Sequence, residues 1–368
     1  MQMRALFPQR GAFLGVLALS VLLLAGCGGS STQETLYWLD GAWPEETAAD
    51  HGFDADGLRA VHEDDPDALA FAVFHQGKLI YEWYDAGRAM TAETPWQLFS
   101  GTKSFSSTLI GRAMQLGLVD IDDAATDTIP EWLGTESETL AVRHLLDGSS
   151  GRFWSFAIDF PGLGGSPQAA DLTAKAIALD QQYEPGTTWQ YNQMAMQCLD
   201  RVISASAGEA TAAFAQRELF DKIGMTNSLI GTDEVGQMTM AWGIEASARD
   251  FARLGLLFLN DGVWNGERLI APGFVQEAWA AGDDPNPAYG LMWWRNTDDD
   301  FLMPVSLEER SGVRFYPDGP DDMVAASGFL GQFLIVVPSE DLMIVRLGGG
   351  TRDGLLNDIY AGVAAARD

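Results

Sequence analysis

The segment Ser100-Gly101-Thr102-Lys103-Ser104-Phe105 places a hydroxyl and an amine three residues apart at the start of a predicted amphipathic helix. The apolar positions of that helix are Phe105, Leu109, Ile110, Ala113, Met114 and Leu116. Side chains at i and i+3 lie on one helix face, so the Lys103 amine can reach the Ser100 hydroxyl. A free serine hydroxyl is a poor nucleophile and needs such a base. A helix N-terminus also favours the negative charge of a tetrahedral intermediate.

The Ser-x-x-Lys spacing is informative because lysine is rare in this chain. The lysines are Lys78, Lys103, Lys175 and Lys222. At average composition, about a quarter of one such match is expected by accident. The alternative interpretation is a solvated lysine that follows a helix N-cap. The assignment of Ser100 as a nucleophile therefore depends on further motifs in the chain.

The N-terminus predicts export and a lipid anchor. A basic start is followed by an apolar run over residues 13–25, which is too short for a membrane-spanning helix of about 20 residues and fits a signal peptide. The run ends in Leu24-Ala25-Gly26-Cys27, which resembles a bacterial lipobox. We expect a signal peptide over 1–26, lipidation of Cys27, a tether over 27–42 and a location in the bacterial cell envelope. The alternative is an ordinary secretory signal in which Cys27 is incidental.

The charge and cysteine content exclude several classes of protein. The chain carries 52 acidic and 22 basic side chains, a net charge of −30, which disfavours nucleic-acid binding because phosphate neutralisation needs clustered Lys and Arg. With Cys27 lipidated, Cys198 is the one remaining thiol, so no disulfide framework forms and Cys198 is expected in the core. No histidine has metal-ligand spacing, so we expect no cofactor. The acidic clusters predict a solvated acidic surface and are Asp64-Asp65, Asp122-Asp123, Asp283-Asp284 and Asp298-Asp299-Asp300.

Strand-like segments lie at both ends of the chain and helical segments in the middle. Residues 69–75 and 78–84 are apolar and aromatic runs around Gln76-Gly77, which predicts a β-hairpin. Residues 332–337 and 342–347 predict a second hairpin. The sequence therefore predicts an α+β fold, an antiparallel sheet of N- and C-terminal strands flanked by helices, with an all-helical lobe inserted over about 104–285. Predicted helices cover 100–116, 172–179, 194–205, 210–220, 248–259 and 355–366.

The order of several motifs resembles that of the serine β-lactamase and penicillin-binding-protein superfamily. The resemblance covers 43–368 and is strongest to class C-like members, the family VIII carboxylesterases and 6-aminohexanoate-oligomer hydrolases. Ser100 to Phe105 is similar to the family's Ser-x-x-Lys segment, in which the serine is acylated. The further matching stretches are 120–131, 142–146, 149–151, 184–191, 248–253, 262–266 and 328–332, followed by Val337-Pro338.

The resemblance implies a serine hydrolase that acts on an ester or amide bond through an acyl-enzyme and uses no cofactor. Ser100 would attack the carbonyl, with Lys103 and Tyr191 as coupled general base and acid. The backbone N–H groups of Ser100 and Phe329 would hold the oxyanion. The other implied substrate-binding residues are Gly328, Gln193 and Ser327.

The proton on the base poses a physical problem. A free lysine titrates near 10.4, and lowering the pKa of Lys103 to about 7–8 requires roughly 4 kcal/mol of differential interaction, from burial or a nearby cation. A Tyr191 tyrosinate that shares the proton is an equally good description at this point.

Two motifs depart from the family pattern. The usual Tyr-x-Asn reads Tyr191-Asn192-Gln193, so either Gln193 supplies the amide with a longer reach or Asn192 turns inward. The usual Lys-Thr-Gly or His-x-Gly reads Ala326-Ser327-Gly328, which lacks the base that binds a substrate carboxylate. We therefore expect a small substrate that is uncharged at this position. The alternatives are a β-lactamase or D-amino-acid peptidase and a non-catalytic, lipid-tethered sensor on the same fold.

Overall fold

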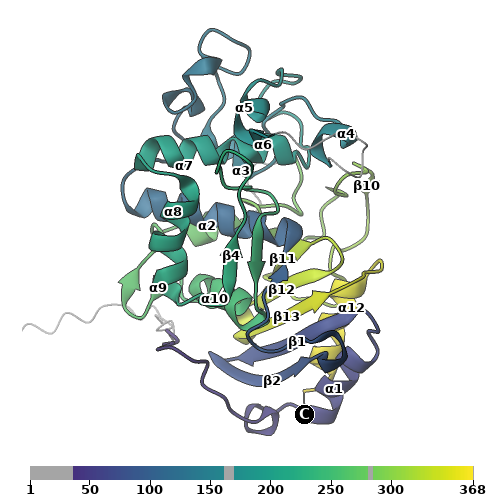
Figure 1. The fold of residues 1–368 in the computed structure, drawn as a ribbon. Coiled ribbons are helices and arrows are strands. Elements are labelled where there is room, and N and C mark those ends of the chain that lie inside the picture. The colour runs from purple at the N-terminus through teal and green to yellow at the C-terminus, as the bar shows by residue number, and fades with distance from the viewer. Residues whose placement is uncertain (1–35, 161–169, 281–284, 368) are drawn as a thin grey trace, which may run out of the picture. The chain divides into compact units, whose positions relative to one another are not determined.

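The centre of the structure is a six-stranded sheet (Figure 1). The computed structural model describes residues 36–160, 170–280 and 285–367, and Thr35–Asp368 form one compact unit. The signal peptide, Cys27 and the acidic pair Asp283-Asp284 lie outside the described residues. The predicted domain boundaries, including those of the helical lobe, stay predictions.

Strands from both ends of the chain share this sheet, as the sequence predicts. Each neighbouring pair is antiparallel. The Gln76-Gly77 turn has φ angles of 51° and 71°, the left-handed values of a tight hairpin turn. The strands in spatial order are β2 (Lys78–Tyr84), β1 (Ala68–His75), β13 (Leu342–Gly348), β12 (Gln332–Val337), β11 (Val324–Gly328) and β8 (Trp294–Arg295).

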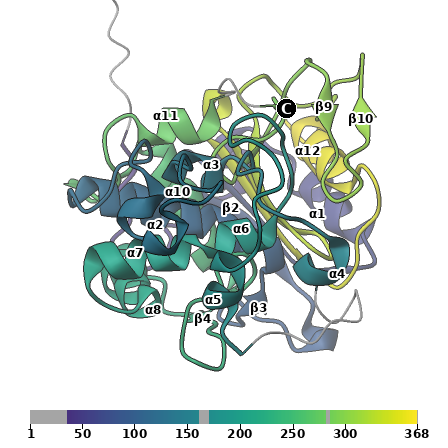
Figure 2. The same ribbon diagram turned by 90° about the horizontal axis from the view of Figure 1, so that it is seen from above.

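Helices cover both faces of the sheet. Figure 2 shows α1 (Ala55–Glu63) and α12 (Leu355–Ala365) on one side, and α2 (Thr102–Gln115) and α10 (Ala248–Leu259) on the other. Because both faces are covered, β12 and β13 are buried along their whole length, which explains their continuous apolar runs.

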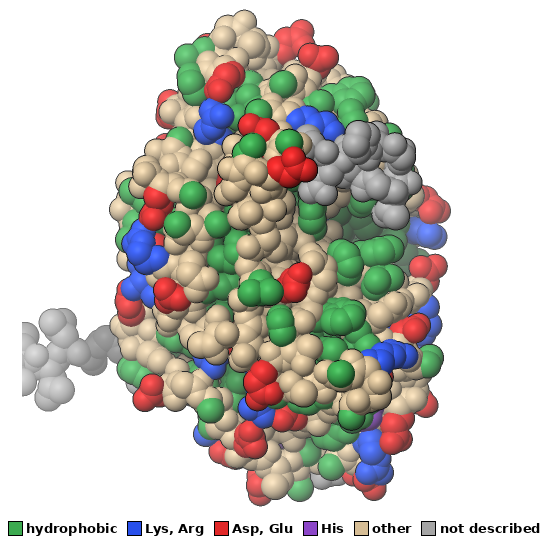
Figure 3. Space-filling model, viewed as in Figure 1, with side chains coloured by type: hydrophobic (Ala, Val, Ile, Leu, Met, Phe, Trp, Pro, Cys, Tyr) green, Lys and Arg blue, Asp and Glu red, His purple; other side chains and the backbone are tan. Residues whose placement is uncertain are grey.

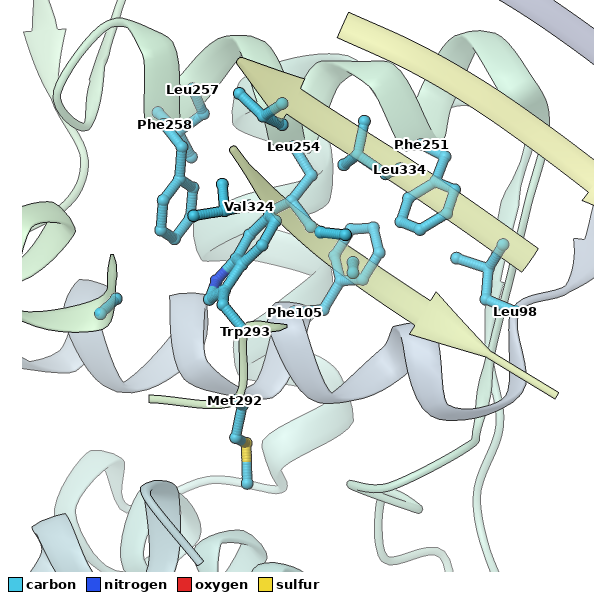
Figure 4. Packing of buried hydrophobic residues seen from close by; sticks show 14 of the residues in the cluster. Leu98, Phe105, Phe251, Leu254, Leu257, Phe258, Met292, Trp293, Val324 and Leu334 are labelled. Atoms are coloured by element: carbon cyan, nitrogen blue, oxygen red, sulfur yellow. The ribbon is translucent and has the colours of Figure 1, made fainter. Parts of the chain in front are cut away.

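The packing between α2, α10 and the sheet forms the part of the core that supports the site (Figure 4). Phe105 of α2 stacks on Phe251 of α10 at 5.9 Å between ring centroids, and Phe258 of α10 contacts Trp293 at 4.8 Å. The expectation that α2 is amphipathic is wrong, because all residues from Thr102 to Ala113 are buried. One side of the helix contacts β11 and another contacts α7 (Leu199–Ala207). The hydroxyls of Ser104, Ser106 and Thr108 therefore hydrogen-bond to carbonyl groups inside the protein.

Short helices and small sheets fill the middle of the chain. The predicted helix over 248–259 is confirmed as α10, whereas the one over 194–205 is two helices. The one over 210–220 consists of α8 (Thr211–Ala215) and a π-helical turn over Gln216–Phe220. Cys198 is fully buried, as predicted. The remaining helices are α3 (Val142–Leu146), α4 (Phe156–Asp159), α5 (Leu172–Ile177), α6 (Gln193–Gln197), α8 (Thr211–Ala215), α9 (Asp221–Ile223) and α11 (Phe274–Trp279).

Three small sheets are present among the described residues, and two of them place strands inside the segment 104–285 that the sequence predicts to be all-helical. They are β3 (Trp96–Gln97), β5 (Ile244–Ala246) and β4 (Ser228–Ile230) in one sheet, and the pairs β6 (Val263–Trp264) with β7 (Glu267–Arg268) and β9 (Phe301–Leu302) with β10 (Glu309–Arg310). Among the described residues, the structure contains no helix with the length and apolar character that a bilayer crossing requires.

A buried ion pair anchors the turn between β11 and β12. Arg346 of β13 donates to both carboxylate oxygens of Asp65 at 2.8 and 3.1 Å, and to the carbonyl oxygens of Leu330 and Gly331 at 2.9 and 2.7 Å. The interpretation of Asp64-Asp65 as solvated is therefore wrong for Asp65, whose side chain is 9% exposed. A guanidinium in the core needs a carboxylate partner, which the sequence pattern does not reveal.

Replacing Asp65 is expected to destabilise the fold strongly. Asp65→Ala leaves the Arg346 charge buried without its partner, so the free energy of unfolding in urea should fall by about 3–5 kcal/mol. Arg59→Ala is the control. It removes the ion pair between the half-exposed Arg59 and Asp56, and should change the free energy of unfolding by less than about 1 kcal/mol. Equal effects of the two substitutions would contradict the role of the buried pair.

Candidate active site

The proposed nucleophile lies in a tight turn that leads into α2. A 3₁₀ turn covers Phe99–Gly101, and the Gly101 N–H donates to the Leu98 carbonyl at 3.0 Å. Phe99 has a φ of 48°, a strained value for a bulky residue, and it directly precedes Ser100. Ser100 therefore stands just before the first turn of α2, and its Cβ direction is set by a turn held between β3 and the helix.

Lys103 lies in the first turn of α2 and is 1% exposed. Its Nζ donates to Ser100 Oγ at 3.0 Å, to Gln193 Oε1 at 3.1 Å and to the Ala241 carbonyl at 3.0 Å. The same atom lies 4.6 Å from the centroid of the Tyr191 ring. The structure thus brings together the serine, the lysine and the tyrosine that the sequence singles out.

Burial changes the acid–base chemistry of these groups. Desolvation lowers the pKa of Lys103 to about 7, with the charge of Asp159 acting in the opposite direction. Burial raises the pKa of the Tyr191 phenol far above its ordinary value of 10, although a hydrogen bond with Ser100 lowers it in part. Near neutral pH the tyrosine keeps its proton while a large fraction of the lysine is neutral. These pKa shifts fit Lys103 better than a Tyr191 tyrosinate as the predicted base for Ser100, a role that stays a prediction.

The structure decides between the two readings of Tyr191-Asn192-Gln193. The Gln193 amide faces the site, because its oxygen accepts from Lys103 and its nitrogen donates to the Asp159 carbonyl at 2.7 Å. Asn192 turns away and caps α6, where its Oδ1 accepts from the Ala195 N–H at 2.9 Å. The longer side chain of glutamine thus reaches the lysine from the first residue of α6.

The sequence does not identify one buried carboxylate of the site, which contacts the residue that hydrogen-bonds to Lys103. Asp159, the last residue of α4, is 1% exposed and accepts from the Gln193 N–H at 2.6 Å and from Trp154 Nε1 at 3.1 Å. Burial raises the pKa of Asp159 to about 7, and the bonds from Gln193 and the charge of Lys103 lower it in part. Nothing in the segment 153–160 resembles a motif, so no sequence signal pointed to this residue.

The end of β11 passes close to the turn Phe99–Gly101, which carries Ser100 and is called the nucleophile turn below. A Cβ added to Gly328 would collide with the Leu98 carbonyl oxygen and lie 3.2 Å from the Gly101 nitrogen, so only glycine fits. Neither the Ser100 nor the Phe329 N–H has a hydrogen-bond acceptor within the described part of the chain. Ser327 is half-buried on the same strand end. These features fit the predicted oxyanion and substrate contacts, whose roles stay predictions.

A cavity of about 650 Å³ opens beside this strand end. Its lining includes Ser327, Gly328, Phe329 and a row of aromatic rings. Trp294 stacks on Tyr191 at 5.8 Å and on Phe315 at 5.5 Å, so one aromatic wall leads from the tyrosine into the cavity. Figure 3 shows hydrophobic side chains gathered on the right of this face, whereas acidic and basic side chains are scattered over it.

The fit of Gly328 against the turn generates a prediction. Gly328→Ala should force β11 away from Ser100 and lower kcat/KM by about 10²-fold, because displacements near 1 Å at a reacting centre cost that much. Gly349→Ala, where an added Cβ meets its nearest atoms at 4.0 Å, is the matched control. Both variants would be assayed with an activated ester, and unchanged activity of Gly328→Ala would contradict the close approach.

Comparison with known proteins identifies the family. The family model described as Beta-lactamase matches residues 59–358. A 6-aminohexanoate-dimer hydrolase of Paenarthrobacter ureafaciens is 23% identical over 332 residues, covering 79% of this chain and 77% of that protein. A Beta-lactamase of Pseudomonas fluorescens is 22% identical over 198 residues, covering 51% and 53%, so this match spans about half of that relative.

Solved structures share the fold. A β-lactamase from Sulfitobacter sp. EE-36 matches with a TM-score of 0.63 and 20% identity, over 84% of this chain and 96% of that chain. A penicillin-binding-protein homologue from Caulobacter crescentus matches with a TM-score of 0.64 and 17% identity, over 83% and 97%. These likenesses confirm the predicted α+β architecture. Since the family model covers more than half of the residues, the chain belongs to the Beta-lactamase family.

Proposed function

We propose that this serine hydrolase cleaves a neutral ester or amide through an acyl-enzyme on Ser100. The observation that carries the proposal is the buried Lys103 amine, which hydrogen-bonds to Ser100 Oγ and whose pKa burial lowers to about 7. A neutral amine in this position accepts the serine proton as the hydroxyl attacks.

The reaction proceeds in two halves. Ser100 Oγ forms a bond to the substrate carbonyl carbon while Lys103 takes its proton, and the oxyanion binds the N–H groups of Ser100 and Phe329. The proton then passes through Tyr191 to the departing alcohol or amine as its bond to carbon breaks. Water, deprotonated by the same base, attacks the acyl-enzyme and releases the acid and the free serine.

We expect the substrate to be neutral beside the scissile bond, because β11 carries no cationic side chain that could bind an anionic group. Ala326 is buried on the same face of β11 as Gly328, the face that packs against the turn carrying Ser100. Arg346 on β13 is engaged by Asp65 and two carbonyls. Arg310 and Arg352 line the neighbouring cavity, and each is paired with a carboxylate, Glu308 and Asp358 respectively.

The aromatic cavity accommodates the leaving-group side of the substrate. Its wall begins at Trp294, which stacks on Tyr191, the group that protonates the departing atom. Phe301 and Phe315 meet edge to face at 4.8 Å and continue the apolar lining. Such a surface favours an apolar or aromatic leaving group over a charged one.

The nucleophile and base should be indispensable. Ser100→Ala and Lys103→Ala are each expected to lower kcat on a p-nitrophenyl ester of a short acid by about 10³-fold or more, because the two residues act as one unit. Wild-type activity should rise with pH through about 7 as Lys103 loses its proton. Lys175→Ala on α5 is the control and should retain full activity. More than a tenth of the wild-type rate in Ser100→Ala would falsify the assignment.

Ala326 should decide between neutral and anionic substrates. The missing charge-assisted bond corresponds to about 1.5–3 kcal/mol, or roughly ten- to a hundredfold in kcat/KM for an anionic substrate. Wild type should hydrolyse a neutral short-chain ester far better than a chromogenic cephalosporin. Ala326→Lys should shift this ratio towards the cephalosporin, whereas Ala326→Met, of similar length and uncharged, should not.

Two outcomes would contradict the neutral-substrate proposal. If wild type prefers the cephalosporin, Arg310 or Arg352 supplies the anion site and the enzyme is a β-lactamase. If Ala326→Lys and Ala326→Met give the same ratio, position 326 does not face the substrate.

We also propose that the mature protein is attached to a bacterial membrane through a lipid on Cys27. The support is the short apolar run and the small residues before the cysteine. Cys27→Ser should abolish incorporation of a labelled fatty acid and leave the precursor uncleaved, whereas Cys198→Ser should do neither. Unchanged labelling and processing of Cys27→Ser would contradict the anchor.

A further inference from the structure

Asp159 is a buried acid that no cation side chain pairs with directly. Within the described residues, no arginine, lysine or histidine side chain forms an ion pair with Asp159. Its carboxylate instead accepts from the N–H groups of Gln193 and Met194, at 2.6 and 3.4 Å, and from Trp154. Burying a carboxylate without an ion pair costs free energy. A buried carboxylate next to a candidate site is therefore a candidate for a functional role.

Gln193 connects this carboxylate to the catalytic lysine. Its backbone N–H donates to Asp159 Oδ2, its side-chain nitrogen donates to the Asp159 carbonyl and its side-chain oxygen accepts from Lys103. Glutamine has one more rotatable bond than the family's asparagine and loses more rotamer entropy when it is held. The two bonds to Asp159 fix both ends of this longer side chain, so its amide oxygen stays on the lysine.

We propose that Asp159 is a positioning residue for the hydrolytic reaction, which fixes Lys103 through Gln193 and places a buried carboxylate near that amine. The inference rests on the proposed function, because it assigns how the base of that reaction is controlled. Asp159 itself lies behind Gln193 and reaches Lys103 through it.

The charges around Lys103 make the direction of the effect clear. The groups near its amine are Ser100, Tyr191 just before α6, Gln193 at the start of α6, Asp159 from α4 and the Ala241 carbonyl. Of these, Asp159 is the group whose charge acts on Lys103, and it raises a pKa that burial lowers. The phenol of Tyr191 stays neutral because burial raises its pKa. Removing the Asp159 charge therefore lowers the pKa of Lys103.

The test is the pH dependence of Asp159→Asn and Asp159→Glu. Asparagine keeps the size and can still accept from Gln193 while it removes the charge, whereas glutamate keeps the charge. In Asp159→Asn, the acid limb of kcat/KM for a neutral ester should move to lower pH, with the largest gain in activity near pH 7, where the wild-type carboxyl acquires its charge. In Asp159→Glu the limb should stay near that of wild type. Asp200→Asn on α7, another buried acid that lies away from Lys103, should leave the limb unchanged.

A second readout needs no activity. Lysine labelled with ¹³C at Cε gives signals for only four residues, and Lys103→Ala identifies the Lys103 signal. Its titration should move to lower pH in Asp159→Asn and not in Asp159→Glu or Asp200→Asn. If the titration and the limb are unmoved in Asp159→Asn, or move equally in Asp159→Glu, the proposal is overturned. If the titration moves but wild type cleaves no ester, the proposed function fails and the control of Lys103 by Asp159 stands.

Discussion

The removal of the Lys103 amine from water is the constraint on which the chemistry of this protein depends. A solvated lysine is protonated at neutral pH and cannot accept the Ser100 proton. Here the side chain is 1% exposed, and its pKa falls to about 7 through desolvation. Three oxygens lie within hydrogen-bond distance of Nζ. In the neutral amine, Gln193 and Ala241 accept its two hydrogens, and the lone pair faces Ser100 Oγ, the reacting atom. In the proposed mechanism, burial and orientation together allow this lysine to act as a base.

The fold supplies this burial by enclosing α2. The sheet and α10 cover one side of the helix, and the helices of the middle segment cover the other. A surface helix would leave the first turn in water and Lys103 charged. The same enclosure brings the end of β11 against the nucleophile turn, where Gly328 permits a contact that any side chain would prevent. Arg346 and Asp65 then hold the turn that follows.

The sequence predicts local features well and buried polar partners poorly. The two hairpins follow from Gln76-Gly77 and from apolar runs of strand length, and the helix over 248–259 is predicted to the residue. The pairing of Ser100 with Lys103 follows from their i, i+3 spacing at the start of the helix, together with the later motifs that single out this segment. In contrast, the full burial of α2 and the Asp65–Arg346 pair depend on elements distant in sequence, which periodicity does not encode. Asp159 also escapes prediction for this reason, because its proposed role depends on its contacts with Gln193 and not on a motif.

The most direct test of the account is intact-mass analysis of the protein after incubation with a serine-directed phosphonate over a range of pH. The account predicts one adduct per chain, a rate of formation that rises through about pH 7, and no adduct in Ser100→Ala. It also predicts a strongly reduced rate in Lys103→Ala, since the serine then lacks its base. An adduct that persists in Ser100→Ala, or a rate in wild type that does not depend on pH between 5 and 9, would contradict the claim that a buried neutral lysine activates this serine.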